Sequence, residues 1–246
     1  MGAAAAELRW AAGHPAVAHT FVDALDEAVT VAGAAGHHLA RVRRLRAGEV
    51  VTASAGSREW RPYRVEAVDR GAVKLLAAGA TSLEPDLAPG LAVAFAITKG
   101  DKPERVVQHL TELGVDRIVP VFARRSVTRW RGERIDGVLD RLRRVAREAA
   151  GQCRRAVVPT VEAPVELAEL TGHRGVIVAD RAAPCGARVP EPVDGEWLAL
   201  VGPEGGFAPG ELGGFEPAGR VGIGPHVLRA ETAAVAIAAV LATERR

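Results

Sequence analysis

Residues 202–207 read Gly-Pro-Glu-Gly-Gly-Phe, and residues 223–233 read Ile-Gly-Pro-His-Val-Leu-Arg-Ala-Glu-Thr-Ala. The first stretch directly follows the apolar run 197–201, which has the pattern of a strand buried on both faces. The second leads from a short strand into an apolar helix expected over 229–244. Ligands in open parallel sheets bind beyond the carboxyl ends of the strands. Both stretches therefore mark the candidate site of an α/β domain.

The residue types in these stretches indicate a flat ligand held by the main chain. Glycines let the backbone approach a ligand closely, and Pro203 stiffens one wall. Such a loop suits an adenine-like ring. It does not suit a phosphate, because the sequence has neither a Gly-Lys-Ser/Thr motif nor a Gly-x-Gly-x-x-Gly opening a helix. Glycine and proline alone are equally compatible with a simple tight turn after an edge strand.

The rest of the C-terminal half continues the alternation of strand and helix. We expect buried strands at 91–97, 117–122 and 175–179, in addition to 197–201. One helix is expected from Pro103 to about Gly114, and a second over about 135–149, with an apolar stripe and arginines mostly off it. Alternation of this kind predicts a parallel sheet. The last helix is apolar on nearly every side, so the core or a second subunit must cover it.

The N-terminal half has a different pattern of predicted secondary structure. Short β-type runs at 20–24, 49–53, 61–68 and 72–76 are separated by turn residues, and one helical segment is expected at 37–46. Several short strands with one helix predict a small barrel. Residues 79–90, with two prolines and two acids, have the composition of a linker.

Composition excludes several classes of protein. Of the 246 residues, 48% are apolar and 25% are charged, which is typical of a soluble globular chain. No apolar run approaches the ~20 residues of a membrane span, and no signal-type segment opens the chain, so we expect a cytoplasmic protein. Cys153 and Cys185 are far apart and the histidines are scattered. A disulfide framework and a metal site are therefore not expected.

Positive charge is carried almost entirely by arginine, because Lys74, Lys99 and Lys102 are the only lysines. A GC-rich genome would produce that bias without any functional cause. The arginines are nevertheless clustered, at 41–46, at 124–134 and at 141–155. The planar guanidinium matches phosphate oxygens in a bidentate way. On this ground alone, RNA binding and a merely solvated surface are equally favoured.

Taken together, the two glycine-containing stretches closely resemble the SPOUT methyltransferases. Within them the chain is similar to the family that methylates N3 of a uridine in 16S ribosomal RNA. Further similar segments occur at 37–39, 42–43, 48–49, 112–115, 125–126 and 148–150, together with Gln152 and Arg155. The resemblance runs from about residue 21 to residue 241. Gly151 departs from the pattern, because the family usually carries a glutamate there, and residues 1–19 have no counterpart.

The resemblance implies a fold of two domains. Residues 81–246 would form a SPOUT α/β domain with a parallel sheet and a deep C-terminal trefoil knot, which is a rare exception to the rule that chains are unknotted. Residues 1–80 would form a PUA-like β-barrel that binds RNA, with 1–19 as an extension and a candidate for disorder. It also implies a homodimer whose cofactor sites lie near the interface.

The resemblance further implies S-adenosylmethionine as the methyl donor and 16S ribosomal RNA or the small ribosomal subunit as the partner, with no metal and no membrane. The residues expected to bind the donor are Leu200, Gly202, Pro203, Glu204, Gly205, Ile223, Gly224, Leu228, Arg229 and Thr232. Those expected to bind RNA are Arg41, Arg43, Arg44, Arg125, Arg154 and Arg155.

Three residues are candidates for catalysis. N3 of uracil carries a proton at neutral pH, so the enzyme must remove it or stabilise negative charge on the ring. Arg229 and Arg155 are candidates for charge stabilisation, the latter across the dimer. Glu204 is a candidate for accepting the proton and equally for holding the loop in place. For Glu231 the holding role is favoured, because a carboxylate in the first turn of a helix is stabilised there.

Alternative functions stay open at this point. A related SPOUT enzyme could modify another RNA base or a ribose 2′-OH. A non-catalytic RNA-binding assembly factor would use the glycine stretches only as turns. An enzyme acting on nucleotide phosphates is disfavoured, because the phosphate-binding lysine and the metal-binding aspartate motif are missing.

Overall fold

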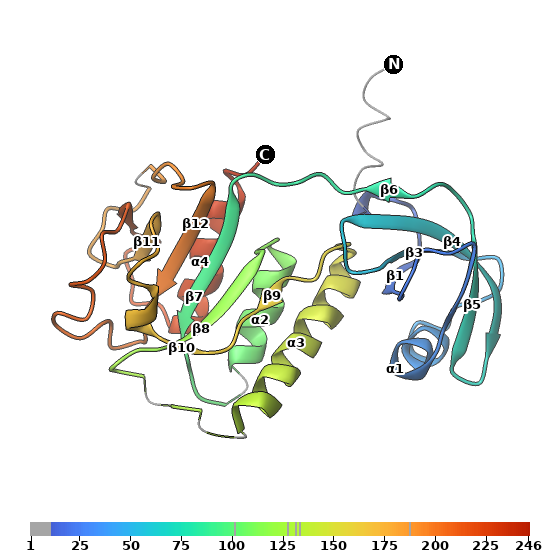
Figure 1. Cartoon of the computed structure of the whole chain (residues 1–246), viewed down its shortest axis with the longest axis horizontal. Helices are drawn as coiled ribbons and strands as arrows, with labels where there is room; N and C mark the ends of the chain where they lie inside the picture. The colour runs from blue at the N-terminus through green and yellow to red at the C-terminus, as the bar shows by residue number, and fades with distance from the viewer. Residues whose placement is uncertain (1–10, 101, 127, 131, 133, 187) are drawn as a thin grey trace, which may run out of the picture. The chain divides into compact units, whose positions relative to one another are not determined.

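The computed structural model describes residues 11–100, 102–126, 128–130, 132, 134–186 and 188–246. These residues form two compact units (Figure 1). The first, the barrel unit, contains the described residues up to Asp86 together with Glu148–Val158. The second, the catalytic unit, contains Leu87–Arg147 and Pro159–Arg246. The barrel unit therefore extends past residue 80, where the sequence places the domain boundary, and it also takes in residues 148–158. The domain bounds 1–80 and 81–246 stay predictions.

The barrel unit is built on a mixed sheet in the order β1-β3-β4-β5-β2, with β6 paired to β4. Only β1 and β3 pair in parallel among these strands of the described residues; the other pairs are antiparallel. The bounds are β1 (Ala18–Phe21), β2 (Ala28–Val31), β3 (Val50–Ser54), β4 (Glu59–Asp69), β5 (Ala72–Ala77) and β6 (Ser82–Leu83). Alternating side chains of β4 and β5, among them Tyr63, Val65, Val73 and Leu75, form the core of this unit.

The helical segment of the barrel unit begins earlier than the sequence predicts. α1 spans Gly33–His37 and continues as a π-helical turn over His38–Val42. Its first residue follows Ala32, which offers no side-chain cap, so no start signal was available in the sequence. Gly36 lies against the carbonyl oxygens of Val31 and Gly71, where a Cβ would overlap both. Close packing of backbone against backbone at Gly36 therefore determines where this helix lies.

A buried carboxylate ties three distant segments of the barrel unit together. Glu84 is 2% exposed, and its two carboxylate oxygens accept the backbone N–H groups of Ala11 and Ala156, each at 3.1 Å. The Ser54 hydroxyl donates to the Ala156 carbonyl at 2.8 Å. From Ala11 onward the N-terminal extension is thus packed onto the unit, while residues 1–10 of the expected extension lie outside the described residues.

The catalytic unit has an all-parallel sheet in the order β10-β8-β7-β12-β11-β13, with β9 paired to β8. Its strands are β7 (Gly90–Ala96), β8 (Arg117–Phe122), β9 (Thr160–Val161), β10 (Val165–Glu166), β11 (Val176–Ala179), β12 (Glu196–Val201) and β13 (Gly219–Val221). After its first residue, β7 is buried throughout, as are β8 and β12. The sequence prediction of strands buried on both faces is confirmed.

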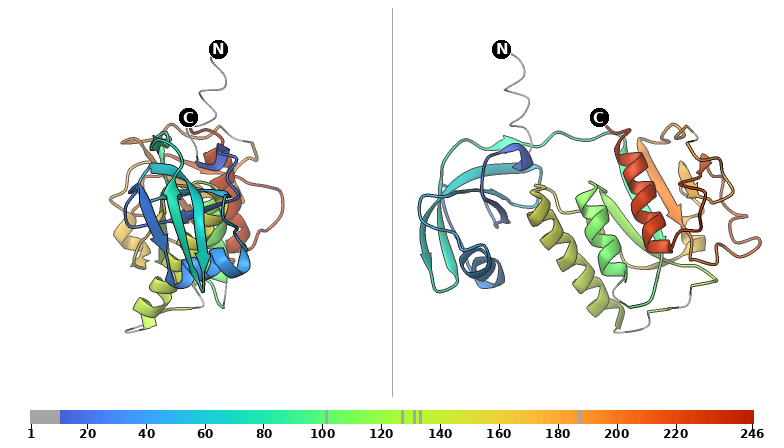
Figure 2. Two further views of the ribbon diagram at one scale, coloured as in Figure 1. Left: turned by 90° about the vertical axis from the view of Figure 1, so that its right-hand side faces the viewer. Right: turned by 180° about the vertical axis from the view of Figure 1, so that it is seen from behind.

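Helices α2 (Lys102–Glu112) and α4 (Ala230–Ala242) pack side by side on one face of this sheet (Figure 2). α4 also contacts β7 and β12. α3 spans Arg134–Cys153, so its last turns belong to the barrel unit. It ends where Arg154 adopts a left-handed conformation, φ +60°, and Arg155 N–H bonds back to the Ala150 carbonyl at 2.9 Å.

These features confirm the fold class predicted from the sequence, an α/β domain with a parallel sheet beside a small β unit. The trefoil knot stays a prediction. Among the described residues, no helix combines the length and apolarity that a bilayer crossing requires. Nor do three or more histidine, cysteine, aspartate or glutamate side chains of these residues gather as a metal site.

Candidate active site

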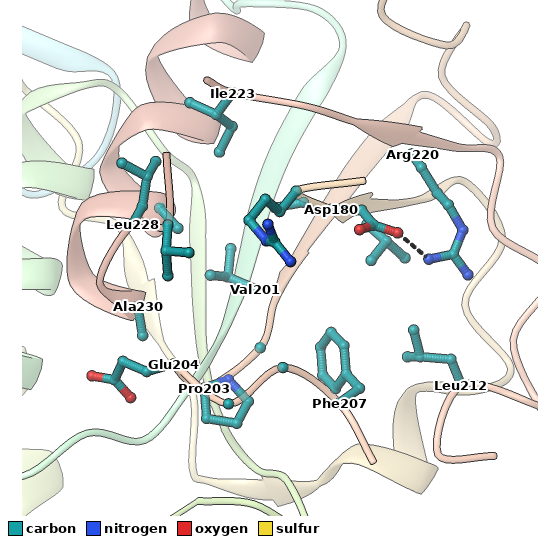
Figure 3. A pocket seen from close by; sticks show the side chains of 18 of the residues that line it. Asp180, Val201, Pro203, Glu204, Phe207, Leu212, Arg220, Ile223, Leu228 and Ala230 are labelled. Atoms are coloured by element: carbon teal, nitrogen blue, oxygen red, sulfur yellow. Dashed lines mark hydrogen bonds and ion pairs between the residues drawn. The ribbon is translucent and has the colours of Figure 1, made fainter. Parts of the chain in front are cut away.

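A cavity of about 730 Å³ lies at the carboxyl ends of β11 and β12 and at the start of α4 (Figure 3). Its walls come from residues 178–181, 201–208, 210, 212–213, 220, 223–224, 226–228, 230 and 233. Both glycine-containing stretches of the sequence therefore line one cavity, although about fifteen residues separate them along the chain. This is the edge of the sheet at which ligands of parallel α/β domains bind.

The first wall, formed by residues 202–207, depends on glycine at two positions. A Cβ at Gly202 would lie 3.0 Å from the ring of Phe207, which folds back over the loop. Gly206 has φ +67°, a conformation that other residues rarely adopt, and its N–H donates to the Pro203 carbonyl at 2.8 Å. The loop is thus a closed turn with Phe207 packed against its own backbone. Pro203 and Phe207 both face the cavity (Figure 3).

The second wall, formed by residues 223–230, is mainly apolar. Ile223, Leu228 and Ala230 face the cavity from this side (Figure 3). The chain reaches the wall through Gly222, where a Cβ would overlap the carbonyl oxygen of Ala183 in the neighbouring loop. Main chain and small side chains therefore set the distance between the loop after β11 and the loop after β13.

Lys102, the first residue of α2, bridges the two carboxylates that the sequence singled out. Its ammonium group lies 3.2 Å from Glu231 and 3.7 Å from Glu204. The three side chains come from the start of α2, the loop after β12 and the first turn of α4. The sequence carries no signal for this role of Lys102, because a lone charged residue at a helix start forms no recognisable pattern.

Glu231 is held in its ionised form. Burial, the largest influence, acts to raise its pKa, but the hydrogen bond from its own backbone N–H and the charges of Lys102 and Arg229 together lower the pKa below its usual range. A carboxylate with a lowered pKa is a weaker base. This supports the holding role over proton abstraction for Glu231.

Arg125, expected to bind RNA, instead reaches the glycine loop in this structure. Its guanidinium donates to the Gly205 carbonyl at 2.6 Å. Gly205 lies directly opposite the arginine stem, since a Cβ there would meet Arg125 Cδ at 3.7 Å. The Arg125 side chain is otherwise exposed to solvent.

The structure brings together most of the residues expected to bind the donor. Those that line the cavity are Gly202, Pro203, Glu204, Gly205, Ile223, Gly224 and Leu228. Leu200 is fully buried in the core of the sheet, where Phe207 packs against the same cluster. Arg229 and Thr232 are exposed at the start of α4, beside the cavity lining in sequence but outside it.

The other expected residues are distributed over both units. Glu204 and Arg229 belong to the catalytic unit, whereas Arg155 belongs to the barrel unit. Arg41, Arg43 and Arg44 lie in and just after the helical segment of the barrel unit, and Arg43 donates to the Val17 carbonyl at 2.7 Å. Arg154, which follows α3, donates to the His14 carbonyl at 3.1 Å. Arg131 of the second arginine group lies outside the described residues.

Asp180 and Arg220 also line the cavity, and neither is among the site residues predicted from the sequence. They form an ion pair at 2.6 Å (Figure 3). A signal for Asp180 was present, because it directly follows the strand predicted at 175–179, at the end where ligands bind. Arg220 carried no such signal, since β13 is short and has no strong apolar pattern.

Comparisons with known proteins match both halves of the chain. Residues 86–242 match the family described as RNA methyltransferase domain, and residues 31–77 match the RNA methyltransferase PUA domain. Ribosomal RNA small subunit methyltransferase E of Mycobacterium tuberculosis is 34% identical over 235 residues, covering 89% of each chain. The Bacillus subtilis protein of the same name is 28% identical over 229 residues, covering 85% of this chain and 88% of its own.

Solved structures give the same result for the fold. A Legionella pneumophila protein described as a methyltransferase, in complex with the cofactor SAM, superposes with a TM-score of 0.80 at 25% identity, covering 94% of this chain and 98% of its own. A second structure, from Neisseria gonorrhoeae, also gives 0.80 at 24% identity, covering 92% and 97%. The architecture of both units is therefore shared with solved proteins of nearly the same length.

Proposed function

Since this chain belongs to the ribosomal RNA small subunit methyltransferase E family, we propose that it transfers a methyl group from S-adenosylmethionine to N3 of a uridine in 16S ribosomal RNA. One observation carries the proposal: the loop after β12 and the segment leading into α4 meet in a single cavity at the carboxyl ends of parallel strands. Relatives named ribosomal RNA small subunit methyltransferase E match 89% of the chain.

The cavity suits the donor in size and in the chemistry of its walls. About 730 Å³ falls within the ~300–1,000 Å³ that is usual for small-molecule sites. Ile223, Leu228 and Val201 offer apolar contacts to an adenosyl group, and the turn 202–206 offers main-chain groups. When bound, S-adenosylmethionine supplies an electrophilic methyl group on a sulfonium.

The reaction requires this chain to align the uracil and to manage one proton. N3 loses its proton and forms a bond to the methyl carbon, while the carbon–sulfur bond breaks and its electron pair stays on sulfur. Most of the acceleration comes from alignment. Arg229 stabilises the negative charge that spreads over the ring oxygens as the proton leaves. Glu204, which lines the cavity and whose side chain is 43% exposed, receives that proton or passes it to water.

Arg155 is the third proposed catalytic residue, and it comes from the barrel unit. A homodimer would let it act on the site of the partner subunit. The outer side of α4 supports a dimer, because this apolar helix leaves Val240 37% exposed in the single chain. Arg41, Arg43, Arg44, Arg125 and Arg154 are proposed to bind the ribosomal RNA, and the protein is proposed to act in the cytoplasm.

The experiment that tests this proposal uses small ribosomal subunits from cells that lack the modification. The intact protein is incubated with these subunits and S-adenosylmethionine carrying a labelled methyl group, and the RNA is then digested to nucleosides for mass analysis. We expect the label in 3-methyluridine. Label in a 2′-O-methyl nucleoside or in another base would identify a related methyltransferase. Donor binding without any transfer would favour an assembly factor.

A further inference from the structure

An ion pair on the wall of the cavity has no role in the function proposed so far. Asp180 directly follows β11, and Arg220 lies in the neighbouring parallel strand β13. The Arg220 guanidinium lies 2.6 Å from the Asp180 carboxylate. Figure 3 shows the pair on one side of the cavity and Glu204 on the other, with Val201 between them.

The carboxylate of this pair is fixed before any ligand binds. One oxygen of Asp180 accepts the backbone N–H of Ala182 at 2.9 Å, and the other accepts from Arg220. The Ala182 hydrogen bond is the largest influence, and together with Arg220 and Arg181 it lowers the pKa of Asp180 against the effect of burial. Asp180 therefore presents a full negative charge at neutral pH, in a defined orientation.

Both members of the pair remain within reach of a ligand. The Asp180 side chain is 27% exposed and the Arg220 side chain 47% exposed, and both line the cavity. A guanidinium has five N–H donors, and within the described part of the chain one of them is used for Asp180. A carboxylate offers about four acceptor positions, of which two are used here. The pair can therefore take up a second ion pair without breaking its own.

The donor of the proposed reaction has two chemically different ends. Its adenosyl end is flat and mostly apolar, which suits the wall of Ile223 and Leu228. Its amino-acid end carries an α-ammonium and an α-carboxylate close together. Such a zwitterion needs an anion and a cation at a fixed spacing, and a guanidinium is the side chain that best matches a carboxylate. Apart from Glu204 and His226, the acidic and basic side chains that line the cavity are Asp180, Arg181 and Arg220.

We propose that the Asp180–Arg220 pair binds the amino-acid end of the methyl donor, with Asp180 facing the ammonium and Arg220 facing the carboxylate. This inference rests on the proposed function, because it assumes that the cavity holds this donor. It makes the pair the element that distinguishes the complete donor from adenosine derivatives that lack the amino acid. The adenosyl end is then directed toward Leu228 and the methyl group toward the side of Glu204.

The test compares two ligands by titration calorimetry on the intact protein. S-adenosylhomocysteine has the amino-acid end, and 5′-methylthioadenosine lacks it. We expect the wild type to bind the first about 10- to 100-fold more tightly, which is the range for charge-assisted hydrogen bonds. Asp180→Asn and Arg220→Gln should each remove most of that ratio while leaving the affinity for 5′-methylthioadenosine unchanged.

Two controls keep the test decisive. Arg188→Gln removes an exposed ion pair with Glu191 in the same unit, away from the cavity lining, and should leave the ratio as in the wild type. Should the cavity variants fail to fold, as seen by thermal unfolding, the wild type is titrated instead with the decarboxylated analogue of S-adenosylhomocysteine. That analogue should bind at least tenfold more weakly than the parent compound.

The outcomes separate this inference from the proposed function. If both variants keep the wild-type ratio, or weaken the two ligands equally, the pair only joins β11 to β13 and the assignment is overturned. If the wild type binds neither ligand, the assignment and the proposed function fail together. Tight binding of the decarboxylated analogue would overturn the assignment alone.

Discussion

The candidate site of the catalytic unit and the interior of the barrel unit use polar groups in opposite ways. In the catalytic unit, the charged residues of the candidate site stand in loops, at the starts of two helices and in β13, around a cavity at the edge of a buried parallel sheet. In the barrel unit, polar side chains are buried inside, among them His19, Thr52, Ser54 and Glu84. The first arrangement presents chemistry to a ligand, whereas the second holds together segments that are far apart in the sequence.

This difference predicts different responses to perturbation. Buried polar groups are costly when a partner is lost, so changes in the barrel unit should appear first as lost stability. Changes at the cavity should appear first as lost affinity for the donor.

The largest effect is expected for Gly222→Ala in the catalytic unit. The new methyl group would overlap the Ala183 carbonyl, so the loop after β11 and the segment after β13 must move apart. Both carry cavity residues, Asp180 on one side and Ile223 on the other. Overpacking against backbone costs on the order of 3 kcal/mol. We expect affinity for S-adenosylhomocysteine, measured by calorimetry, to fall roughly 100-fold.

Gly137→Ala is the matched control for this substitution. Gly137 lies within α3, where a Cβ would meet nothing within 4 Å. Alanine should stabilise the helix by about 1 kcal/mol and leave donor affinity unchanged. Wild-type affinity in Gly222→Ala would mean that the two loops move freely, and the cavity would then not be preformed by their packing.

The next effect is a dependence of stability on pH, located in the barrel unit. Burial, with a smaller contribution from the charge of Arg154, lowers the pKa of His19 from 6.5 to about 4. The unfolded chain takes up a proton on this histidine near pH 6.5, whereas the folded protein does so only near pH 4. Stability from this group is therefore complete above about pH 6.5 and declines as the pH falls to about 4. The total loss is about 3 kcal/mol.

The pH dependence is measured as the difference in thermal unfolding between the wild type and His19→Gln. A difference is needed because Glu84 acts in the opposite direction: burial raises its pKa, so its contribution to stability grows as the pH falls. Glutamine can keep the hydrogen bond to Thr52 but has no proton to gain. Donor affinity at neutral pH should be equal in both proteins. Parallel stability curves between pH 4 and pH 7 would contradict the prediction.

The sequence was informative where local pattern and global fold agree. β8 begins and ends at the residues predicted, β7 is shifted by one residue at both ends, and β12 begins one residue early. Continuous apolar runs leave no other arrangement for a buried parallel strand. β2 was missed, since Ala28–Val31 is short and half exposed, so pairing with β5 rather than composition makes it a strand. The end of α3 joins the barrel unit through tertiary contacts that periodicity does not encode.

The site was predictable in its loops and not in its pairs of charges. Glycine, proline and the strands before them locate residues 202–207 and 223–228. Lys102, Asp180 and Arg220 act through partners 40 or more residues away, and nothing in one sequence links such positions. None of these three residues is among those that the resemblance to a family implies.

The smallest effect is expected for Lys102→Met, which removes the cation between Glu204 and Glu231. These ion pairs are partly exposed and worth about 1 kcal/mol, so the rate of methyl transfer should fall roughly fivefold. Without Lys102 the pKa of Glu231 should rise, because burial is then less opposed, and the acid limb of the pH–rate profile should move to higher pH. Lys102→Arg should restore most of both.

The profile distinguishes holding from proton transfer. If the two glutamates only anchor the loop and α4, Lys102→Met should weaken donor binding and rate together while the profile shifts, and Lys102→Arg should recover them. A loss of rate at constant donor affinity would instead point to Glu204 as a group that exchanges the N3 proton, since its charge then matters only during the reaction. No change in rate, affinity or profile would leave Lys102 as an ordinary surface cation. The shape of the cavity would then be set by backbone packing alone, whereas buried side chains hold the barrel unit together.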